Sequence, residues 1–161
     1  MRVIKQREII DDSWQLAPPG APVPNDGDLI IGLTEWNASP EALAARAGKT
    51  GVLLKAGEEP EDIKALARIP LIAIEFPKFA DGRGYSSARL LRERFDFKGE
   101  LRAVGDVLRD QLFYMARCGF DSFALKAGKD IERALAAFDD FSVTYQPGAD
   151  DRRPLFRRVP R

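Results

Sequence analysis

The sequence contains no histidine and only one cysteine, Cys118, among its 161 residues. Without an imidazole side chain, the chain can build neither a serine or cysteine triad nor a histidine metal site. A single thiol cannot form a dithiol redox pair or an intrachain disulfide, and we expect neither a covalent cofactor nor an iron–sulfur cluster. Any redox chemistry must therefore come from a bound soluble cofactor or from a partner. We expect Cys118 itself to be a small core residue.

The chain also lacks an excess of either charge, because 25 basic side chains face 25 acidic ones. We therefore expect no global attraction to a polyanion and no nucleic-acid partner. No apolar run approaches the roughly 20 residues that span a bilayer, and the first eight residues lack an apolar signal core. Together with the lone cysteine, this predicts a cytoplasmic protein without a membrane partner.

Proline, glycine and charge divide the chain into three parts. Residues 1–27 combine a short strand near 3–10 with a Pro-rich arm. Residues 28–146 alternate short apolar runs with stretches of helical period, which indicates an α/β domain. Residues 147–161 form a basic tail with five arginines. We expect this tail to be a solvated terminus, the alternative being an arm that docks on an acidic partner or nucleic acid.

Six apolar runs within the α/β domain predict strands, near residues 29–33, 52–54, 71–74, 101–104, 120–125 and 141–145. Five helices are predicted between or after them, near residues 39–48, 59–67, 86–95, 106–119 and 131–138. This alternation is typical of βα repeats in a single layer of mostly parallel strands. Six strands are too few for an eightfold barrel, so we expect an open sheet or a partial barrel. The apolar surface that an incomplete barrel exposes would favour a homodimer.

The most unusual segment follows the third apolar run and enters a helix through Gly82-Arg83-Gly84. Ligands of parallel sheets bind at the carboxyl ends of the strands, in the loops that follow them. The first N–H groups of a helix and an arginine fork both suit a small oxyanion. The predicted anion-binding residues are Arg83, Gly84, Tyr85, Ser86, Arg89 and Arg102.

A second interpretation of the same segment is a dinucleotide-binding turn. The pattern Gly82-x-Gly84-x-x-x-Ala88 resembles a variant of that turn and would place a nicotinamide or flavin phosphate at Gly82–Ser87. The spacing argues against it, because five residues separate the strand from Gly82, whereas the glycines of a Rossmann unit follow their strand almost at once.

Carboxylates near the next strand end provide candidates for a catalytic base. Asp106 and Asp110 lie four residues apart, so on a helix they would share a face and could bind Mg²⁺ or act as acid and base. The pair is of a common type, and we predict no metal site; Asp106 also suits a helix N-cap. Lys55, Glu75 and Lys126 each follow an apolar run, so they should gather at one rim of a parallel sheet.

The run from Ile72 to Leu125 resembles a bacterial family known as domain of unknown function 934. Two motifs carry the resemblance, Phe76-Pro77-x-Phe79-x-Asp81-Gly82-Arg83-Gly84-Tyr85-Ser86-x-Ala88-Arg89 and Leu101-Arg102-Ala103-x-Gly105-Asp106-Val107-x-x-Asp110-Gln111. Members of this family are often labelled as oxidoreductases of sulfite reduction. The resemblance therefore implies a role near that reaction but supplies no mechanism.

Three hypotheses about function follow. The first is an accessory protein of assimilatory sulfite reduction that has no redox centre and binds a small oxyanion, or sulfite reductase, through Arg83, Arg89 and Arg102. The second is a cofactor-dependent oxidoreductase with its nicotinamide or flavin phosphate at Gly82–Ser87. The third is a non-redox α/β enzyme with Asp106 or Asp110 as base.

Overall fold

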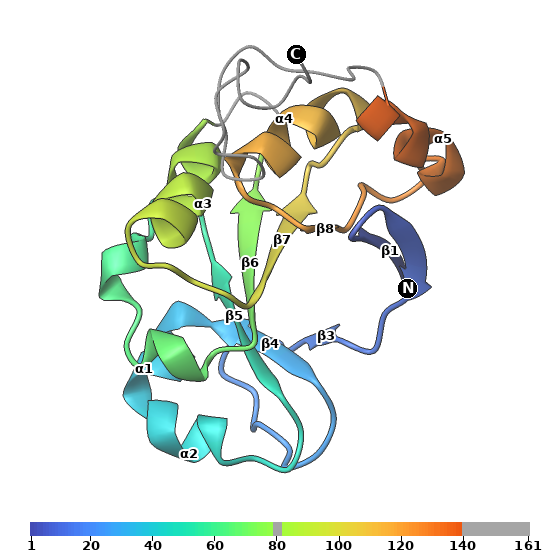
Figure 1. The fold of residues 1–161 in the computed structure, drawn as a ribbon. Helices are drawn as coiled ribbons and strands as arrows, with labels where there is room; N and C mark the ends of the chain where they lie inside the picture. The colour runs from blue at the N-terminus through green and yellow to red at the C-terminus, as the bar shows by residue number, and fades with distance from the viewer. Residues whose placement is uncertain (79–81, 140–161) are drawn as a thin grey trace.

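The computed structural model describes residues 1–78 and 82–139 (Figure 1). The strand predicted at residues 141–145 and the basic tail at 147–161 lie outside the described residues.

Eight strands form one sheet in the order β2-β1-β8-β7-β6-β5-β4-β3. Neighbours from β3 to β8 run parallel, whereas β1 pairs antiparallel with both β8 and β2. The strands are β1 (Arg2–Lys5), β2 (Glu8–Asp11), β3 (Gln15–Leu16), β4 (Leu29–Gly32), β5 (Thr50–Leu54), β6 (Leu71–Phe76), β7 (Glu100–Gly105) and β8 (Ser122–Phe123). This arrangement confirms the predicted α/β fold with a mostly parallel sheet.

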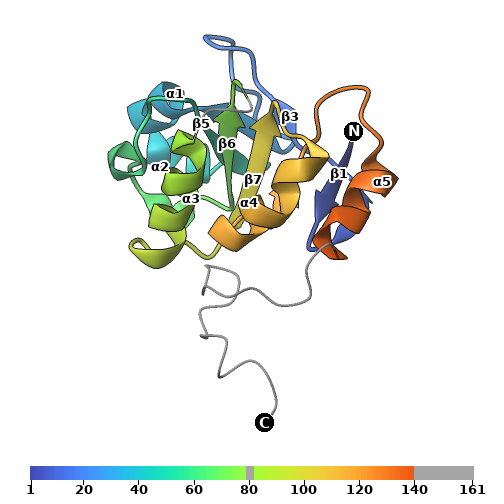
Figure 2. The ribbon, with the colours of Figure 1, turned by 90° about the horizontal axis from the view of Figure 1, so that it is seen from above.

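The helices cover the outer face of this sheet (Figure 1). They are α1 (Leu33–Ala38), α2 (Pro40–Ala44), α3 (Arg83–Glu93), α4 (Leu112–Cys118) and α5 (Ile131–Leu135). Short 3₁₀ helices span Pro60–Asp62, Leu66–Arg68, Arg109–Gln111 and Ala136–Asp139. Figure 2 shows α3 and α4 side by side over β6 and β7, with α5 beside β1. Within the described part of the chain, no helix has the length and apolarity needed to cross a membrane.

The sheet is strongly curled. Strands β2 and β3 lie at its two opposite edges, yet only residues 12–14 join them. Because an extended chain covers at most about 3.5 Å per residue, this link brings the two edges within roughly 14 Å of each other. Figure 1 shows the strands arranged around a common centre with the helices outside. The sheet is therefore a partial barrel, and strands from before residue 28 form both of its edges.

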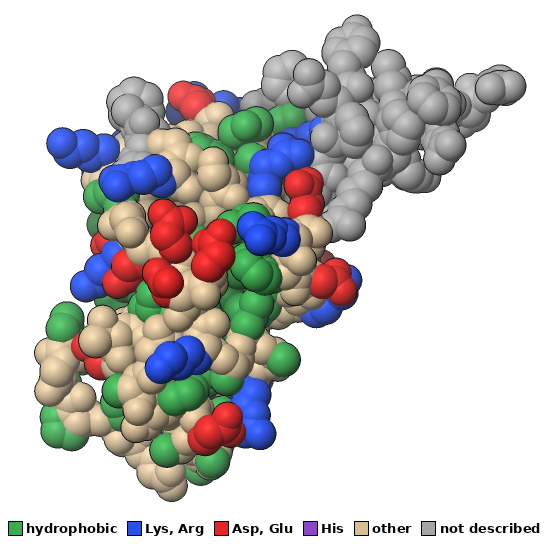
Figure 3. All heavy atoms as spheres, turned by 90° about the vertical axis from the view of Figure 1, so that its left-hand side faces the viewer, with side chains coloured by type: hydrophobic (Ala, Val, Ile, Leu, Met, Phe, Trp, Pro, Cys, Tyr) green, Lys and Arg blue, Asp and Glu red, His purple; other side chains and the backbone are tan. Residues whose placement is uncertain are grey.

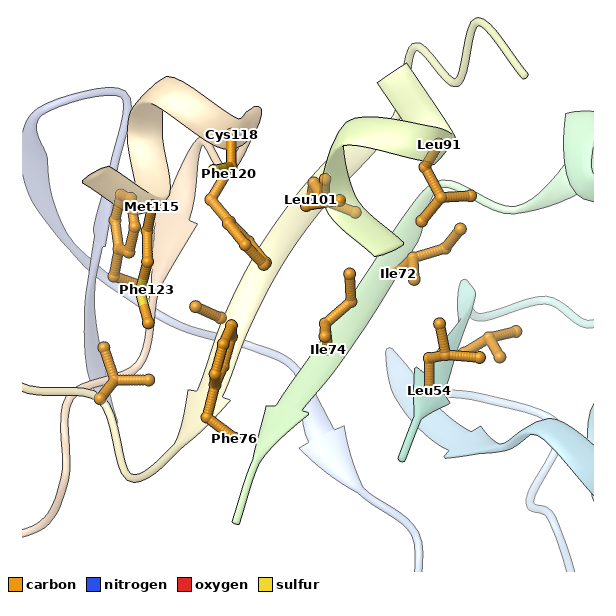
Figure 4. Packing of buried hydrophobic residues seen from close by; sticks show 14 of the residues in the cluster. Leu54, Ile72, Ile74, Phe76, Leu91, Leu101, Met115, Cys118, Phe120 and Phe123 are labelled. Atoms are coloured by element: carbon orange, nitrogen blue, oxygen red, sulfur yellow. The ribbon is translucent and has the colours of Figure 1, made fainter. Parts of the chain in front are cut away.

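Alternation along the strands separates two apolar clusters. Ile72, Ile74 and Phe76 of β6 face the helices and join the large outer core, which Figure 4 shows together with Leu91 of α3. Leu71 and Ala73 face the inside of the curl, where they form a small cluster with Ile30 and Leu53. Burial on both faces explains why the central strands are continuously apolar in sequence.

Several elements differ from those that the sequence predicts. Residues 3–10 form a hairpin instead of one strand, because Gln6 and Arg7 both adopt positive φ angles, 50° and 64°, and turn the chain. The helix predicted at 39–48 ends at Ala44, and the one predicted at 59–67 is reduced to two 3₁₀ turns. Each of these segments is too short for helix propensity to prevail over tertiary packing.

The helix predicted from Asp106 to Gly119 begins later than expected. Its first turn is the 3₁₀ helix at Arg109–Gln111, and α4 follows from Leu112. The predicted end is confirmed, since Gly119 caps the helix with a φ of 115°. Gly48 does not cap a helix in this way; a Cβ at this position would lie 2.0 Å from the carbonyl oxygen of Gly27.

Candidate functional site

A pocket of about 300 Å³ lies at the carboxyl ends of β5 and β6, against the first turns of α3. We call it the Arg83 pocket. Its polar lining comes from the loop after β5, from the end of β6 and from α3, and consists of Lys55, Glu58, Glu59, Glu75, Arg83, Ser86 and Ser87. The pocket is therefore at the position where parallel sheets bind their ligands.

Arg83 is the first residue of α3 and crosses this pocket. Its Nη1 atom lies 3.6 Å from the point that a Cβ on Gly57 would occupy, so the guanidinium reaches the loop after β5. Gly57 has a φ of +89°, which only glycine adopts without strain. In the same loop, the Glu58 carboxylate accepts a hydrogen bond from the Lys55 backbone N–H at 2.7 Å. This short turn therefore holds Lys55 and Glu58 opposite Arg83.

The two residues after Arg83 have mainly structural roles. A Cβ on Gly84 would lie 2.6 Å from the Phe76 ring, so the missing side chain lets α3 pack closely on β6. The ring of Tyr85 lies 5.1 Å from that of Phe76 and 5.1 Å from that of Tyr114, between α3 and α4. Burial raises the pKa of Tyr85. Gly84 lines the Arg83 pocket, as do Ser86 and Ser87, whereas Tyr85 packs away from it.

Two of the predicted anion-binding arginines lie elsewhere. Arg89 makes an i, i+4 ion pair of 3.3 Å with Glu93 on the surface of α3. Arg102 lies on the inner face of β7 with 2% of its side chain exposed. Its direction follows from strand alternation, because its neighbours Leu101 and Ala103 face the outer core. The structure therefore separates both residues from Arg83.

Arg102 is held by carboxylates. It contacts Asp12 through two hydrogen bonds of 2.7 and 2.9 Å and donates to Glu100 at 2.7 Å. Burial alone would lower the pKa of Arg102, but these hydrogen bonds outweigh it and raise the pKa. Lys5 completes the group through a 2.7 Å ion pair with Glu100. Sequence reasoning missed this network, because Asp12 is 90 residues away from Arg102 in the chain.

The two candidate catalytic carboxylates do not share a helix face, so that prediction was wrong. Asp106 precedes the helical segment, where its backbone N–H donates to the Phe76 carbonyl at 2.7 Å and its carboxylate meets Lys126 Nζ at 3.1 Å. The side chain of Asp110 is 92% exposed and lies 3.9 Å from Arg109. Asp106 lies outside the helix because Gly105, with a φ of +91°, turns the chain sharply at the end of β7.

The predicted gathering of rim residues is confirmed. Lys55 and Glu75 line the Arg83 pocket, while Glu75 and Lys126 both line the hollow inside the curled sheet. Glu75 therefore stands between the two cavities. Within residues 1–78 and 82–139, no group of three or more cysteine or carboxylate side chains is placed to hold a metal ion.

The arrangement at the Arg83 pocket suits the binding of a small anion. Arg83 and Lys55 supply positive charge from two different elements, and Ser86 and Ser87 line the pocket from the first turn and the start of the second turn of α3, at the helix end that favours an anion. Three carboxylates also line the pocket, so its lining carries no net positive charge. An anion there would be held by hydrogen bonds from individual donor groups.

Comparison with known proteins places the chain in a family. No curated protein and no solved structure matches it. Residues 51–156, more than half of the 161, match the model of the family described as "Bacterial protein of unknown function (DUF934)". The matched range includes β5 to β8, the Arg83 pocket and both motifs on which the resemblance rests. The chain therefore belongs to the DUF934 family.

Proposed function

We propose that this protein is an accessory component of assimilatory sulfite reduction that binds a small oxyanion in the Arg83 pocket. The observation that carries the proposal is the convergence of Arg83 and Lys55, from α3 and from the loop after β5, on one cavity at the strand ends. A guanidinium fork next to helix N–H groups matches the oxygen geometry of sulfite, sulfate or phosphate.

Local donors, and not a broad positive surface, would carry this binding. On the face shown in Figure 3, acidic and basic side chains of the described residues intermingle. Glu58, Glu59 and Glu75 border the pocket itself and oppose an anion. We therefore expect modest affinity, with selectivity set by the spacing of the donors.

The accessory role follows from the chemistry that the residues can supply. The single thiol, Cys118, is buried in the outer core, and burial raises its pKa. A buried neutral thiol is a poor nucleophile and a poor redox group. In this proposal the electrons for sulfite reduction come from sulfite reductase, which the chain serves by binding either the oxyanion or the reductase itself.

The two alternative hypotheses gain less support. A nicotinamide or flavin phosphate at Gly82–Ser87 would use Gly84 for close approach, whereas the Phe76 ring occupies that space. A base at Asp106 would first have to leave its contact with Lys126.

A thermal-shift panel tests the proposal. Wild-type protein is heated with sulfite, sulfate, phosphate and nucleotides at matched ionic strength, next to Arg83→Gln and the control Arg94→Gln at the far end of α3. A ligand about tenfold above its Kd contributes about 1.4 kcal/mol, which raises Tm by about 3–6 °C at this size. We expect that shift for wild type and Arg94→Gln with an oxyanion, and its loss in Arg83→Gln.

Affinity purification provides the second measurement, since the proposal includes sulfite reductase as a partner. Tagged protein is isolated from a sulfate-grown bacterium that carries it, and the bound fraction is assayed for sulfite reductase. Absence of both an oxyanion response and sulfite reductase would contradict the proposed function.

A further inference from the structure

A second cavity, larger than the Arg83 pocket, lies inside the curled sheet, on the face opposite the outer core. We call it the inner hollow. Its volume is about 680 Å³, more than twice that of the Arg83 pocket. The inner faces of β4 to β7 line it, together with Met1, Asp12 and residues 14–16 and 124–127. No part of the proposed oxyanion site uses this space except Glu75, which borders both cavities.

The geometry of the hollow restricts what can enter it. The link at residues 12–14 joins the two sheet edges, so the hollow is bounded across its open side as well as by the strands. A cavity of about 300–1,000 Å³ with mainly apolar walls is typical of small-molecule sites. The occupant that fits is therefore a small molecule.

The walls are apolar, with one aromatic surface. Ile30, Leu53, Ala73 and Val104 project from four neighbouring strands into the hollow. Trp14, half-buried, forms part of the wall on the side of the link and packs on the small inner cluster. An indole face next to aliphatic side chains favours a flat aromatic ring.

The deep end of the hollow carries no uncompensated charge. Arg102 lines it, but its guanidinium is bound by Asp12 and Glu100, and Lys5 pairs with Glu100. Two positive and two negative groups thus balance each other. Arg102 and Lys5 are therefore already paired and would not attract an anionic ligand to this end of the hollow.

Glu75 is the polar group that a ligand would meet. It follows Ala73 on the inner face of β6 and is half-buried at the rim. Within the described residues, its carboxylate has no hydrogen-bond or ion-pair partner. The nearby Lys126 amine is bound to Asp106 at 3.1 Å. A half-buried carboxylate in this position favours a donor or a positive charge on the ligand.

We propose that the inner hollow binds a small, flat aromatic molecule that carries an amine or an N–H donor. The ring packs against Trp14 and the apolar floor, and the donor contacts the Glu75 carboxylate. This site is separate from the Arg83 pocket, which takes an oxyanion.

Two probes of equal shape and opposite charge test this assignment. Biphenyl-4-ylmethylamine and biphenyl-4-acetate are titrated into the full chain by isothermal calorimetry, and tryptophan emission is followed in parallel. Trp36 is fully buried in the outer core and donates to the Lys64 carbonyl at 2.7 Å, so its emission should not respond. We expect the amine to bind at least about tenfold more tightly than the acid, as a charge-assisted hydrogen bond predicts.

Variants locate the site. Ala73→Leu and Val104→Phe each fill the hollow, and both should abolish binding while circular dichroism and Tm show a folded protein; if one fails to fold, the other decides. Glu75→Gln should reduce the preference for the amine to less than about threefold. The control is Glu59→Gln, which changes a carboxylate that lines the Arg83 pocket but not the inner hollow. This variant should keep the full preference for the amine.

Three results would overturn the assignment. They are no binding of the amine by wild type, equal binding of the acid, or full affinity in a folded Ala73→Leu or Val104→Phe protein. The oxyanion proposal has its own readout, because Arg83→Gln should abolish the oxyanion response and keep amine binding. Failure of one proposal therefore leaves the other testable.

Discussion

Arg102 shows how the sequence can place a residue on the correct strand and still leave its partners unpredicted. Its motif, at the end of a predicted strand near other basic residues, indicates anion binding. The structure instead places it inside the curl, where Asp12 and Glu100 already supply its anions. Sequence periodicity predicts which strand carries Arg102, but Asp12 reaches it through a long-range contact that no local pattern encodes.

Replacing Arg102 by Met should destabilise the fold strongly. It leaves two carboxylates buried, with 3% and 8% side-chain exposure, and without their main partner. Breaking such a buried pair costs about 3–5 kcal/mol, as urea unfolding at neutral pH would measure. Arg89→Met, which removes a half-exposed ion pair, serves as the control and should cost less than about 1 kcal/mol. Equal losses in the two variants would contradict a structural role for Arg102.

The loss of unfolding free energy in Arg102→Met should also depend on pH. Burial tends to raise the pKa of Glu100, but hydrogen bonds from Lys5 and Arg102 outweigh it and lower the pKa. A carboxyl whose folded pKa is lowered stabilises the fold above its unfolded pKa, and this contribution is lost as pH falls through the folded value. Without Arg102, Glu100 takes up its proton at higher pH. The stability gap between wild type and variant should therefore narrow from about pH 7 to about pH 4.

At the scale of elements, the sequence predicts the central strands well and the short helices poorly. Continuous apolar runs identify β4 to β7, because burial on both faces leaves a strong signal. The hairpin of β1 and β2 is missed because its turn uses Gln6 and Arg7 at positive φ instead of glycine. The Arg83 pocket is only partly predictable: α3 supplies Arg83 and Ser86 from one motif, whereas Lys55 and Gly57 come from a distant loop.

The contact between α3 and β6 gives a prediction at this scale. Gly84→Ala would place a Cβ 2.6 Å from the Phe76 ring and push the helix away from the strand. Overpacking of this kind costs about 1–3 kcal/mol, despite the better helix propensity of alanine. Gly82→Ala is the matched control, since its Cβ would meet nothing within 4 Å, and thermal unfolding should separate the two variants. An unchanged Tm in Gly84→Ala would show that α3 does not depend on this close approach.

At the scale of the whole molecule, the curl of the sheet determines where chemistry can occur. A partial barrel with helices outside leaves two kinds of cavity, one between strand ends and α3 and one inside the curl. The sequence predicts an open sheet or partial barrel, but not that residues 12–14 link β2 to β3 across the open side. That closure depends on a three-residue link between distant strands, which becomes visible only in three dimensions.

Oxyanion binding in the Arg83 pocket is the part of the proposed function that a structure can test. The most direct measurement is a crystal structure of the full chain soaked in sulfite, compared with Arg83→Gln under the same conditions. We predict tetrahedral or pyramidal density between the Arg83 guanidinium, Lys55 and the Ser86 and Ser87 hydroxyls in wild type, and none in the variant. An empty pocket in wild type, with the anion bound at another place in the molecule, would contradict oxyanion binding by the Arg83 pocket.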